Sequence, residues 1–246
     1  MSLGLGLNLS KGVVKNPPLS AYSLSFDGSG DYVAFTETAF PIGDDGDKFS
    51  VSFWAQRDTT ATSEDAVLTN TSTWKKRINF DTAGTGLLME GDFNGQQCKG
   101  DVTADTAWHH YVITLNNNGA QGFPIVYEDG AAVSTALGSL GANEANFTIN
   151  SIGSPSGGGV TGFDGLLYQI AIWDVTLSAN AVASIYNFGS PVSLERNTGN
   201  YESSGDLVTL WKFAEGTGST TADSVGSLTG TLNGDTAFSS TTPINP

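Results

Sequence analysis

The sequence predicts an all-β protein built from two packed antiparallel sheets with one short helix. Three observations carry this prediction. Turn signals such as Asp27-Gly28, Asp129-Gly130 and Asn233-Gly234 recur between short apolar segments. The segments 108–115 and 165–173 are apolar on both faces, which is typical of central strands covered from either side. Convincing helical periodicity is confined to one segment, which begins at residue 178.

The first long strands are expected at 49–56 and 108–115. In the earlier segment apolar residues alternate with polar ones, so that Val51, Phe53 and Ala55 share one face. The later segment places Tyr111, Ile113 and Leu115 on one face and Val112 on the other. Both strands are therefore expected in the interior of the sandwich.

A further central strand is expected at 165–173, directly before the helix. Strict alternation places one group of apolar residues on one face and a second group on the other: Leu166, Tyr168, Ile170 and Ile172, against Leu167, Ala171 and Trp173. Ser178 can cap the helix, and Val182, Ile185 and Tyr186 lie at helical spacing before it ends near Asn187. A lone helix of this length is expected to plug one end of the sandwich.

The chain divides into four segments. Residues 1–21 are expected to form an extended arm, 22–188 the sandwich, 189–206 a connector, and 207–246 a final strand segment. The arm lacks the basic start of a signal peptide. It reads either as a flexible leader or as a strand that docks on a partner through Leu3, Leu5, Leu7 and Leu9.

Composition excludes several classes of function. The chain has 246 residues, with 10 Lys and Arg against 25 Asp and Glu, which gives a formal net charge of −15. A chain this acidic has no footprint for a nucleic-acid backbone. No apolar run approaches the roughly 18–20 residues that span a bilayer, so no membrane insertion is expected. The single cysteine, Cys98, can form neither an internal disulfide nor a Cys-rich zinc site.

Five phrases in sequence resemble the laminin-G-like (concanavalin A-like) jelly-roll superfamily of lectins and glucanases. They are LSFDG at 24–28 with DYV at 31–33, FSVSFW at 49–54, WHHYV at 108–112, VYEDG at 126–130, and FDGLLYQIAIW at 163–173. The resemblance extends through the helix to about residue 188. It implies a jelly-roll sandwich in which the first phrase forms an opening hairpin.

The tail carries a second resemblance. WKFAEGTG at 211–218 and GTLNG at 230–234 look like the segment with which many such domains begin. Either the tail pairs beside the N-terminal strands of its own chain, or it is given to a neighbouring copy. The chain resembles virion proteins of tailed phages, especially marine phages, in having a short leader, an acidic sandwich and such a tail. This implies a virion surface location and partners among other virion proteins.

Catalytic motifs are weak throughout. Glycosidase chemistry needs two carboxylates at a fixed spacing, and the nearest pair, Glu90 and Asp92, reads as part of a turn. There is no G-x-S-x-G elbow. His109 and His110 lie in a strand, where one is expected to pack in the core and the other to face solvent. Cys98 is expected to be a spectator. No catalytic residue is assigned, and the protein is not expected to be an enzyme.

Two binding sites are predicted. Ca²⁺ prefers carboxylate and carbonyl oxygens, and Asp-Gly turns supply both. The resemblance implies a calcium at the sandwich rim, with Asp27, Asp31 and Asp164 in the matching phrases, although these residues could instead form Asx-turns. Trp74, in a polar stretch, is the tryptophan outside an evident core strand. It is a candidate sugar platform or a contact to another subunit.

Two functions therefore compete. The first is a non-enzymatic structural or decoration protein of a phage virion, attached through the arm and present as several copies. The second is a secreted or surface carbohydrate-binding module or lectin. The first does not exclude the second, because an exposed sandwich on a particle can also bind host or environmental glycans.

Overall fold

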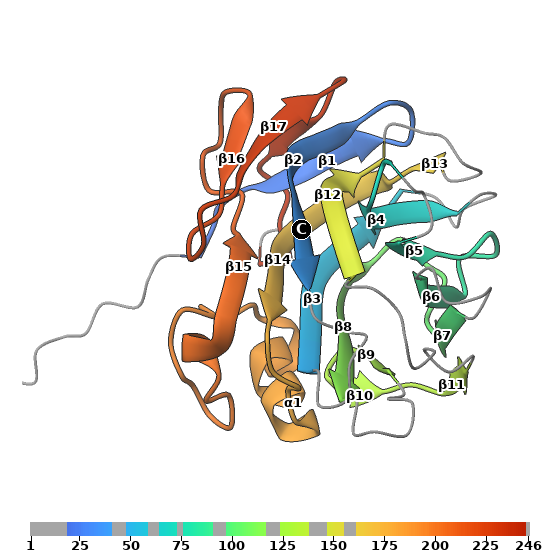
Figure 1. Cartoon of the computed structure of the whole chain (residues 1–246), viewed down its shortest axis with the longest axis vertical. Helices are drawn as coiled ribbons and strands as arrows, with labels where there is room; N and C mark the ends of the chain where they lie inside the picture. The colour runs from blue at the N-terminus through green and yellow to red at the C-terminus, as the bar shows by residue number, and fades with distance from the viewer. Residues whose placement is uncertain are drawn as a thin grey trace, which may run out of the picture.

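The computed structural model describes residues 19–40, 48–58, 64–72, 76–90, 97–116, 124–137, 147–154 and 161–244. Two sheets face each other across a shared core, and one short helix lies against them (Figure 1). This confirms the predicted two-sheet sandwich. Leu3, Leu5, Leu7 and Leu9 lie outside the described residues, so the docking arm stays a prediction. No helix in the described ranges is long and apolar enough to cross a membrane.

The smaller sheet has eight strands in the order β10-β9-β8-β3-β14-β1-β18, with β15 also paired to β14. Its strands are β1 (Ser23–Asp27), β3 (Lys48–Arg57), β8 (Trp108–Asn116), β9 (Ile125–Glu128), β10 (Ala131–Ala132), β14 (Asp164–Trp173), β15 (Leu207–Trp211) and β18 (Ala237–Ser239). All pairs in this sheet are antiparallel.

The larger sheet has ten strands in the order β11-β7-β6-β5-β4-β12-β2-β17-β16, with β13 also paired to β4. Its strands are β2 (Tyr32–Phe40), β4 (Asp65–Thr69), β5 (Arg77–Phe80), β6 (Gly86–Glu90), β7 (Gln97–Asp101), β11 (Thr135–Leu137), β12 (Phe147–Gly153), β13 (Thr161–Gly162), β16 (Thr220–Ala222) and β17 (Thr229–Asn233). The short pair of β13 with β4 is parallel, and the other pairs are antiparallel.

Two apolar clusters cover the two faces of the smaller sheet. The main core lies between the sheets and includes Tyr111, Ile113 and Leu115 from β8. A second cluster on the outer face includes Val112 and the buried face of the helix. The predicted alternation in β8 is therefore confirmed residue by residue, because successive strand residues point to opposite faces.

The strict alternation predicted for β14 is wrong at its centre. Gln169 has a positive φ of 51°, and the register with β3 shifts between Tyr168 and Ala171. A bulge of this kind adds one residue to the strand and reverses the faces of the residues beyond it. Leu167 therefore shares the main core with Ile170 and Ile172, while Ala171 and Trp173 remain in the outer cluster.

The predicted opening hairpin is also corrected. β1 pairs with β14 and β18 in the smaller sheet, whereas β2 pairs with β12 and β17 in the larger one. The turn between them carries the chain from one sheet to the other. Gly28 and Gly30 have φ of 78° and 83°, which residues with a Cβ rarely adopt.

The helix α1 (Ala179–Tyr186) forms where it is predicted. Ser178 is its N-cap and its hydroxyl accepts a hydrogen bond from the backbone N–H of Ala181 at 3.2 Å. Val182 and Ile185 pack on Trp173 and its neighbours in the outer cluster. The helix thus covers the outer face of the smaller sheet near one end of its strands, and does not plug the space between the sheets (Figure 1).

The C-terminal segment joins both sheets of its own chain. β15 pairs with β14, β17 with β2, and β18 with β1, and Figure 1 shows β16 and β17 beside β2. Trp211 is buried against Phe35, with ring centroids 4.9 Å apart. Ser20 is buried as well, and its hydroxyl donates to the carbonyl of Phe213 at 3.0 Å. The first described residues therefore pack against the C-terminal segment.

Trp211→Ala tests how much the tail contributes to stability. Removing this buried ring leaves a cavity in the main core, so we expect the free energy of unfolding to fall by about 3–5 kcal/mol. Val208→Ala is the matched control on the same strand, because Val208 is 37% exposed and should change stability by no more than about 0.5 kcal/mol. Denaturant unfolding measures both, and equal effects would contradict the assigned packing.

Candidate functional site

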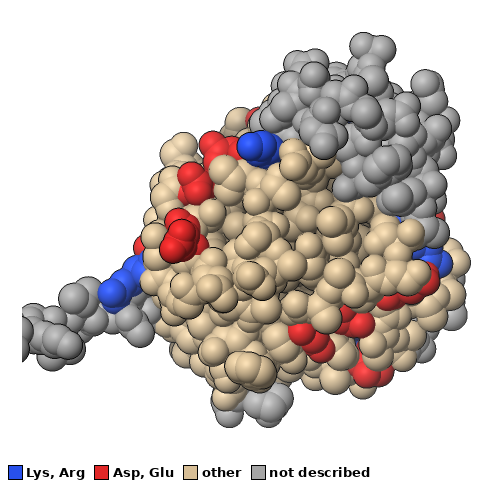
Figure 2. Space-filling view, turned by 90° about the horizontal axis from the view of Figure 1, so that it is seen from below, with Lys and Arg blue, Asp and Glu red and all other residues tan. Residues whose placement is uncertain are grey.

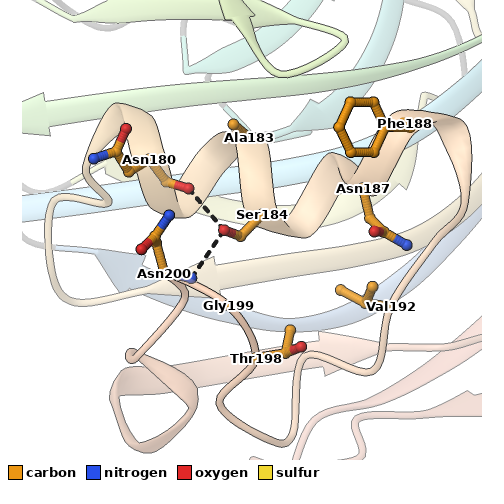
Figure 3. A pocket seen from close by; sticks show the side chains of 9 residues that line it. All are labelled: Asn180, Ala183, Ser184, Asn187, Phe188, Val192, Thr198, Gly199 and Asn200. Atoms are coloured by element: carbon orange, nitrogen blue, oxygen red, sulfur yellow. Dashed lines mark hydrogen bonds between the residues drawn. The ribbon is translucent and has the colours of Figure 1, made fainter.

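A hollow of about 300 Å³ lies between α1 and the loop after it. Its lining is entirely uncharged: Asn180, Ala183, Ser184, Asn187, Phe188, Val192, Thr198, Gly199 and Asn200. Figure 3 shows Asn180 and Asn200 at one end, Ser184 in the middle, and Phe188 at the C-terminal end of the helix. An exposed aromatic residue and side-chain amides therefore border one surface depression.

The position of this hollow is set by the way α1 is anchored. Tyr186, at the last turn of the helix, stacks on Trp54 and His110 with centroid distances of 5.9 and 6.2 Å. Gly130 lies directly beside it, because a Cβ at this position would approach the Tyr186 ring to 2.9 Å. Strands β3 and β8 and the 129–130 turn thereby fix the end of the helix.

Three successive residues with positive φ come directly after the helix. Asn187, Phe188 and Gly189 have φ of 48°, 55° and 85°. Asn187 is the C-cap and its backbone N–H donates to the carbonyl of Ala183, a conformation that Asn tolerates well. Phe does not tolerate this conformation as Asn does, and a residue with a Cβ in the left-handed region destabilises the fold by about 1–2 kcal/mol.

Burial does not offset this strain, because the Phe188 side chain is 98% exposed. The backbone strain and the exposure of the ring both lower the stability of the fold, and no packing contact of the side chain offsets either of them. Strained backbone of this kind gathers at binding and catalytic sites. Phe188 is therefore the strongest single marker of function in the described surface.

The polar groups of the hollow are partly engaged and partly available. Ser184 ties the two sides together: its hydroxyl donates to the Asn180 carbonyl at 2.9 Å and accepts from the Asn200 backbone N–H at 3.0 Å (Figure 3). The Asn187 amide donates to the Ser190 carbonyl at 3.0 Å. The side-chain amides of Asn180 and Asn200 are exposed and form no hydrogen bond within the described ranges. Each amide can both donate and accept.

The face of the molecule at the α1 end carries little charge at its middle. Figure 2 views the molecule from the end at which α1 lies in Figure 1, and the middle of this face shows no Lys, Arg, Asp or Glu. The sequence agrees, because no charged residue occurs from Val175 to Leu194. Lys212, farther along the chain, is held by Glu195 at 3.1 Å.

Sequence reasoning missed this site. It chose Trp74 as the sugar platform, and Trp74 lies outside the described residues, so that role stays a prediction. A signal for Phe188 was present in Asn-Phe-Gly directly after the helix. Asn and Gly favour positive φ at a helix C-terminus, so this tripeptide indicates the turn, whereas the exposure of the ring follows from the structure alone.

The three aspartates predicted to bind calcium are not gathered into one ligand set. Both carboxylate oxygens of Asp31 accept backbone hydrogen bonds, from the N–H groups of Asp27 and Asp235 at 2.9 and 2.6 Å. Asp27 forms an Asx-turn with the N–H of Ser29. Asp27 and Asp164 are cross-strand neighbours, and burial together with the charges of Asp58 and Asp27 raises the pKa of Asp164.

In the part of the chain that the structure describes, no three His, Cys, Asp or Glu side chains are placed to hold a metal ion. Each Asp31 carboxylate oxygen accepts one backbone hydrogen bond, which helps to close the loop between β1 and β2. Calcium binding stays a prediction that the resemblance carries.

Glu90, Asp65 and Cys98 lie in buried surroundings. Glu90, one of the acids considered for glycosidase chemistry, is buried and ion-paired with Arg77. Burial raises the pKa of the Cys98 thiol to about 12, which keeps it protonated. Burial raises the pKa of Asp65 to about 7, against the opposing effect of the nearby Arg57. Arg57 itself donates to the carbonyls of Gly84 and Thr103.

The two histidines have opposite environments. His110 is buried under the Trp54 ring, and desolvation lowers its pKa to about 3. His109 lies among carboxylates, with Nδ1 2.8 Å from Asp129 and Nε2 3.0 Å from Asp105. The hydrogen bond to Asp129 is the main cause that raises the pKa of His109 to about 9. His110 is core-packed as predicted, whereas His109 is held by acids and only 14% exposed.

The chain shares its sequence pattern with a known superfamily. Residues 27–183 match a laminin G family described as the concanavalin A-like lectin/glucanases superfamily. The match spans more than half of the 246 residues, and the chain belongs to this superfamily. The predicted superfamily is thereby confirmed. No curated protein matches the chain.

Solved structures of the same fold include binding proteins. A candidate carbohydrate-binding protein from Bacteroides ovatus aligns with a TM-score of 0.61 at 17% identity, covering 91% of this chain and 60% of that one. The chain thus spans less than two thirds of that protein. A heptameric SAP-like pentraxin from Limulus polyphemus aligns with a TM-score of 0.44 at 14% identity, covering 67% of this chain and 81% of that one. At 17% identity the likeness to the Bacteroides ovatus protein shows the fold alone.

His109 predicts a loss of stability at alkaline pH. Its pKa is about 9 in the folded state against 6.5 for the ordinary group, so its charge stabilises the fold fully below about 6.5. The contribution is lost as the pH rises through 9. Since water screens the partly exposed Asp105 and Asp129, we expect a loss of about 1–2 kcal/mol.

Denaturant unfolding of the wild type and of His109→Gln between pH about 6 and about 10 measures this contribution. Asp65, which also titrates in this range, is present in both proteins, so the difference between the two curves isolates His109. The stability of the variant should decline less than that of the wild type. Parallel curves would show that the carboxylates do not bind an imidazolium.

Proposed function

We propose that this protein is a non-enzymatic carbohydrate-binding module whose sugar contact is Phe188. The observation that carries the proposal is a fully exposed, strained aromatic residue beside a hollow lined with amides. Protein sites for small ligands combine apolar surface with a few convergent polar groups. The superfamily contains both lectins and glucanases, so the choice between them rests on the site.

The chemistry of the hollow matches one face of a sugar. A pyranose ring presents C–H groups on one side, which pack on an aromatic ring, and hydroxyls around its edge. The exposed amides of Asn180 and Asn200 can donate to and accept from such hydroxyls. Phe188 itself offers no polar group, so it supplies contact area and the amides supply orientation.

Hydrolysis is disfavoured at the same site. The lining holds neither a carboxylate nor a histidine, and glycosidases need two carboxylates across the scissile bond. Glu90 and His109 lie elsewhere, paired with Arg77 and with Asp105 and Asp129. Asp65 also lies outside the lining. Binding without bond cleavage is the activity that these residues support.

The setting we propose is the surface of a phage particle, with the sandwich facing outward. The support for it is the similarity of the leader, the acidic sandwich and the tail to tailed-phage virion proteins. Attachment would use residues 1–21, with Leu3, Leu5, Leu7 and Leu9 as the docking face. Several copies could assemble on one particle if apolar contacts or cations overcome the repulsion of −15 charges per chain.

Phe188→Ala should abolish glycan binding on an array while leaving the fold intact, because the ring is exposed. Phe188→Gly should abolish binding too, and should also unfold less readily than Phe188→Ala. Glycine removes about 1–2 kcal/mol of left-handed strain. It also adds about 0.5–1 kcal/mol of chain entropy in the unfolded state, which leaves a net stabilisation of up to about 1.5 kcal/mol. Glycan arrays and thermal melts measure the two effects.

Ile125→Ala is the matched control for these variants, because Ile125 is a partly exposed apolar residue on β9. It should bind glycans as the wild type does. Trp74→Ala, measured alongside, tests the other candidate platform. If Phe188→Ala binds as strongly as the wild type, the assigned sugar contact is wrong.

Truncation tests the particle setting. Ser20 is buried and hydrogen-bonds to Phe213 and Tyr168 in the sandwich, so the deletion should stop at residue 18. We expect the truncated protein to melt like the full chain and to lose attachment to particles in a sedimentation assay. Full attachment of the truncated chain would refute docking through the arm.

A further inference from the structure

We infer that the ligand of the Phe188 hollow is a charge-neutral sugar at a glycan end, and that the site rejects sialylated, uronic-acid and sulfated glycans. The inference rests on the proposed function and names the class of ligand. Its basis is the combination of an uncharged lining, a small open volume and a strongly acidic molecule around them.

The lining of the hollow offers no counter-charge to an anion. Recognition of carboxylate or sulfate groups uses Arg or Lys, most often in bidentate or clustered arrangements. The nine residues that line the hollow include no basic side chain. Lys212, beyond the loop that contains Val192, is already paired with Glu195, and Arg196 in that loop is also engaged in an interaction. An anionic sugar would therefore lose its water in this hollow without gaining a cation.

The electric field of the whole protein acts in the same direction. A formal charge of −15 with acidic residues around the uncharged face repels anions on approach. A neutral ligand is indifferent to that field. Binding of a neutral sugar should therefore change little with salt, whereas any residual binding of an acidic sugar should strengthen as salt screens the repulsion.

The size of the hollow limits the length of the ligand. Pockets for small ligands span about 300–1,000 Å³, and this hollow of about 300 Å³ lies at the lower limit. Phe188 offers one ring, with Asn180 and Asn200 at the opposite end (Figure 3). The geometry fits a terminal sugar or a short terminal segment, and offers no row of rings along which a long polysaccharide could lie.

Asn180 and Asn200 decide orientation, and they also provide a way to change the specificity. Both side chains are exposed, so a lysine at either position can be accommodated without burying charge. Asn200→Lys would place a cation at the edge of the hollow, opposite Phe188. If neutrality of the lining sets the specificity, this one change should admit an acidic sugar that the wild type rejects.

The experiment uses the full chain on an array of matched glycan pairs that differ only by a sialic acid, a uronic acid or a sulfate. We expect neutral members to bind on the order of tenfold more tightly than their acidic partners, a difference of about 1.4 kcal/mol. Phe188→Ala should lose the neutral signal. Asn200→Lys should narrow the gap, and Asn200→Gln is its matched neutral control.

The outcomes separate the two proposals. If acidic members bind as tightly as neutral ones and still need Phe188, the inference is overturned while the proposed function stands. If glycans bind but Phe188→Ala makes no difference, the assigned site is wrong and the inference falls with it. If no glycan binds, both fail, and the exposed ring belongs to a contact with another protein.

Discussion

The burial of β14 on both faces is the constraint on which the rest of the fold depends. One face of this strand completes the main core through Leu167, Ile170 and Ile172, and the other anchors the outer cluster through Ala171 and Trp173. Its neighbours β1 and β3 come from the first quarter of the chain, and β15 comes from the last quarter. A strand apolar on both faces forces a second layer on each side, and the layer outside the smaller sheet is α1.

The site exists because of that second layer. The position of the helix C-terminus is fixed by the end of the sheet, because Tyr186 stacks on His110 and Trp54. Gly130 leaves room for the Tyr186 ring. The chain then turns back through three residues of positive φ, and the loop returns to Ser184 through Asn200. The hollow is thus the gap between a helix fixed by aromatic packing and a loop held by the buried Leu194 and Tyr201 and by the Ser184 hydroxyl. Its lining is uncharged.

The sequence predicts features that follow from local periodic patterns, and it misses features that depend on contacts between distant parts of the chain. Alternation in β8 and the cap at Ser178 arise from local periodicity, and the structure confirms both. The bulge at Gln169 has no local signature, because several residues can adopt positive φ when neighbouring strands hold them. The crossing from β1 to β2 has the composition of a hairpin turn, and only long-range pairing decides it. The Phe188 site depends on a tertiary event, the fixed end of α1, so a search for exposed aromatics in polar loops chose Trp74 instead.

Phe188 is a residue that folding alone would not favour at its position. Glycine closes a left-handed turn without a steric cost, and Gly189, the next residue, does so with φ of 85°. A phenylalanine in the same turn adds strain, and its 98% exposed ring recovers none of the stabilisation that burial would bring. The turn therefore does not need the ring, and the core does not use it. The ring is therefore available for contact on its solvent-exposed side. An apolar face of a ligand packed there would remove from water the surface that the fold leaves exposed.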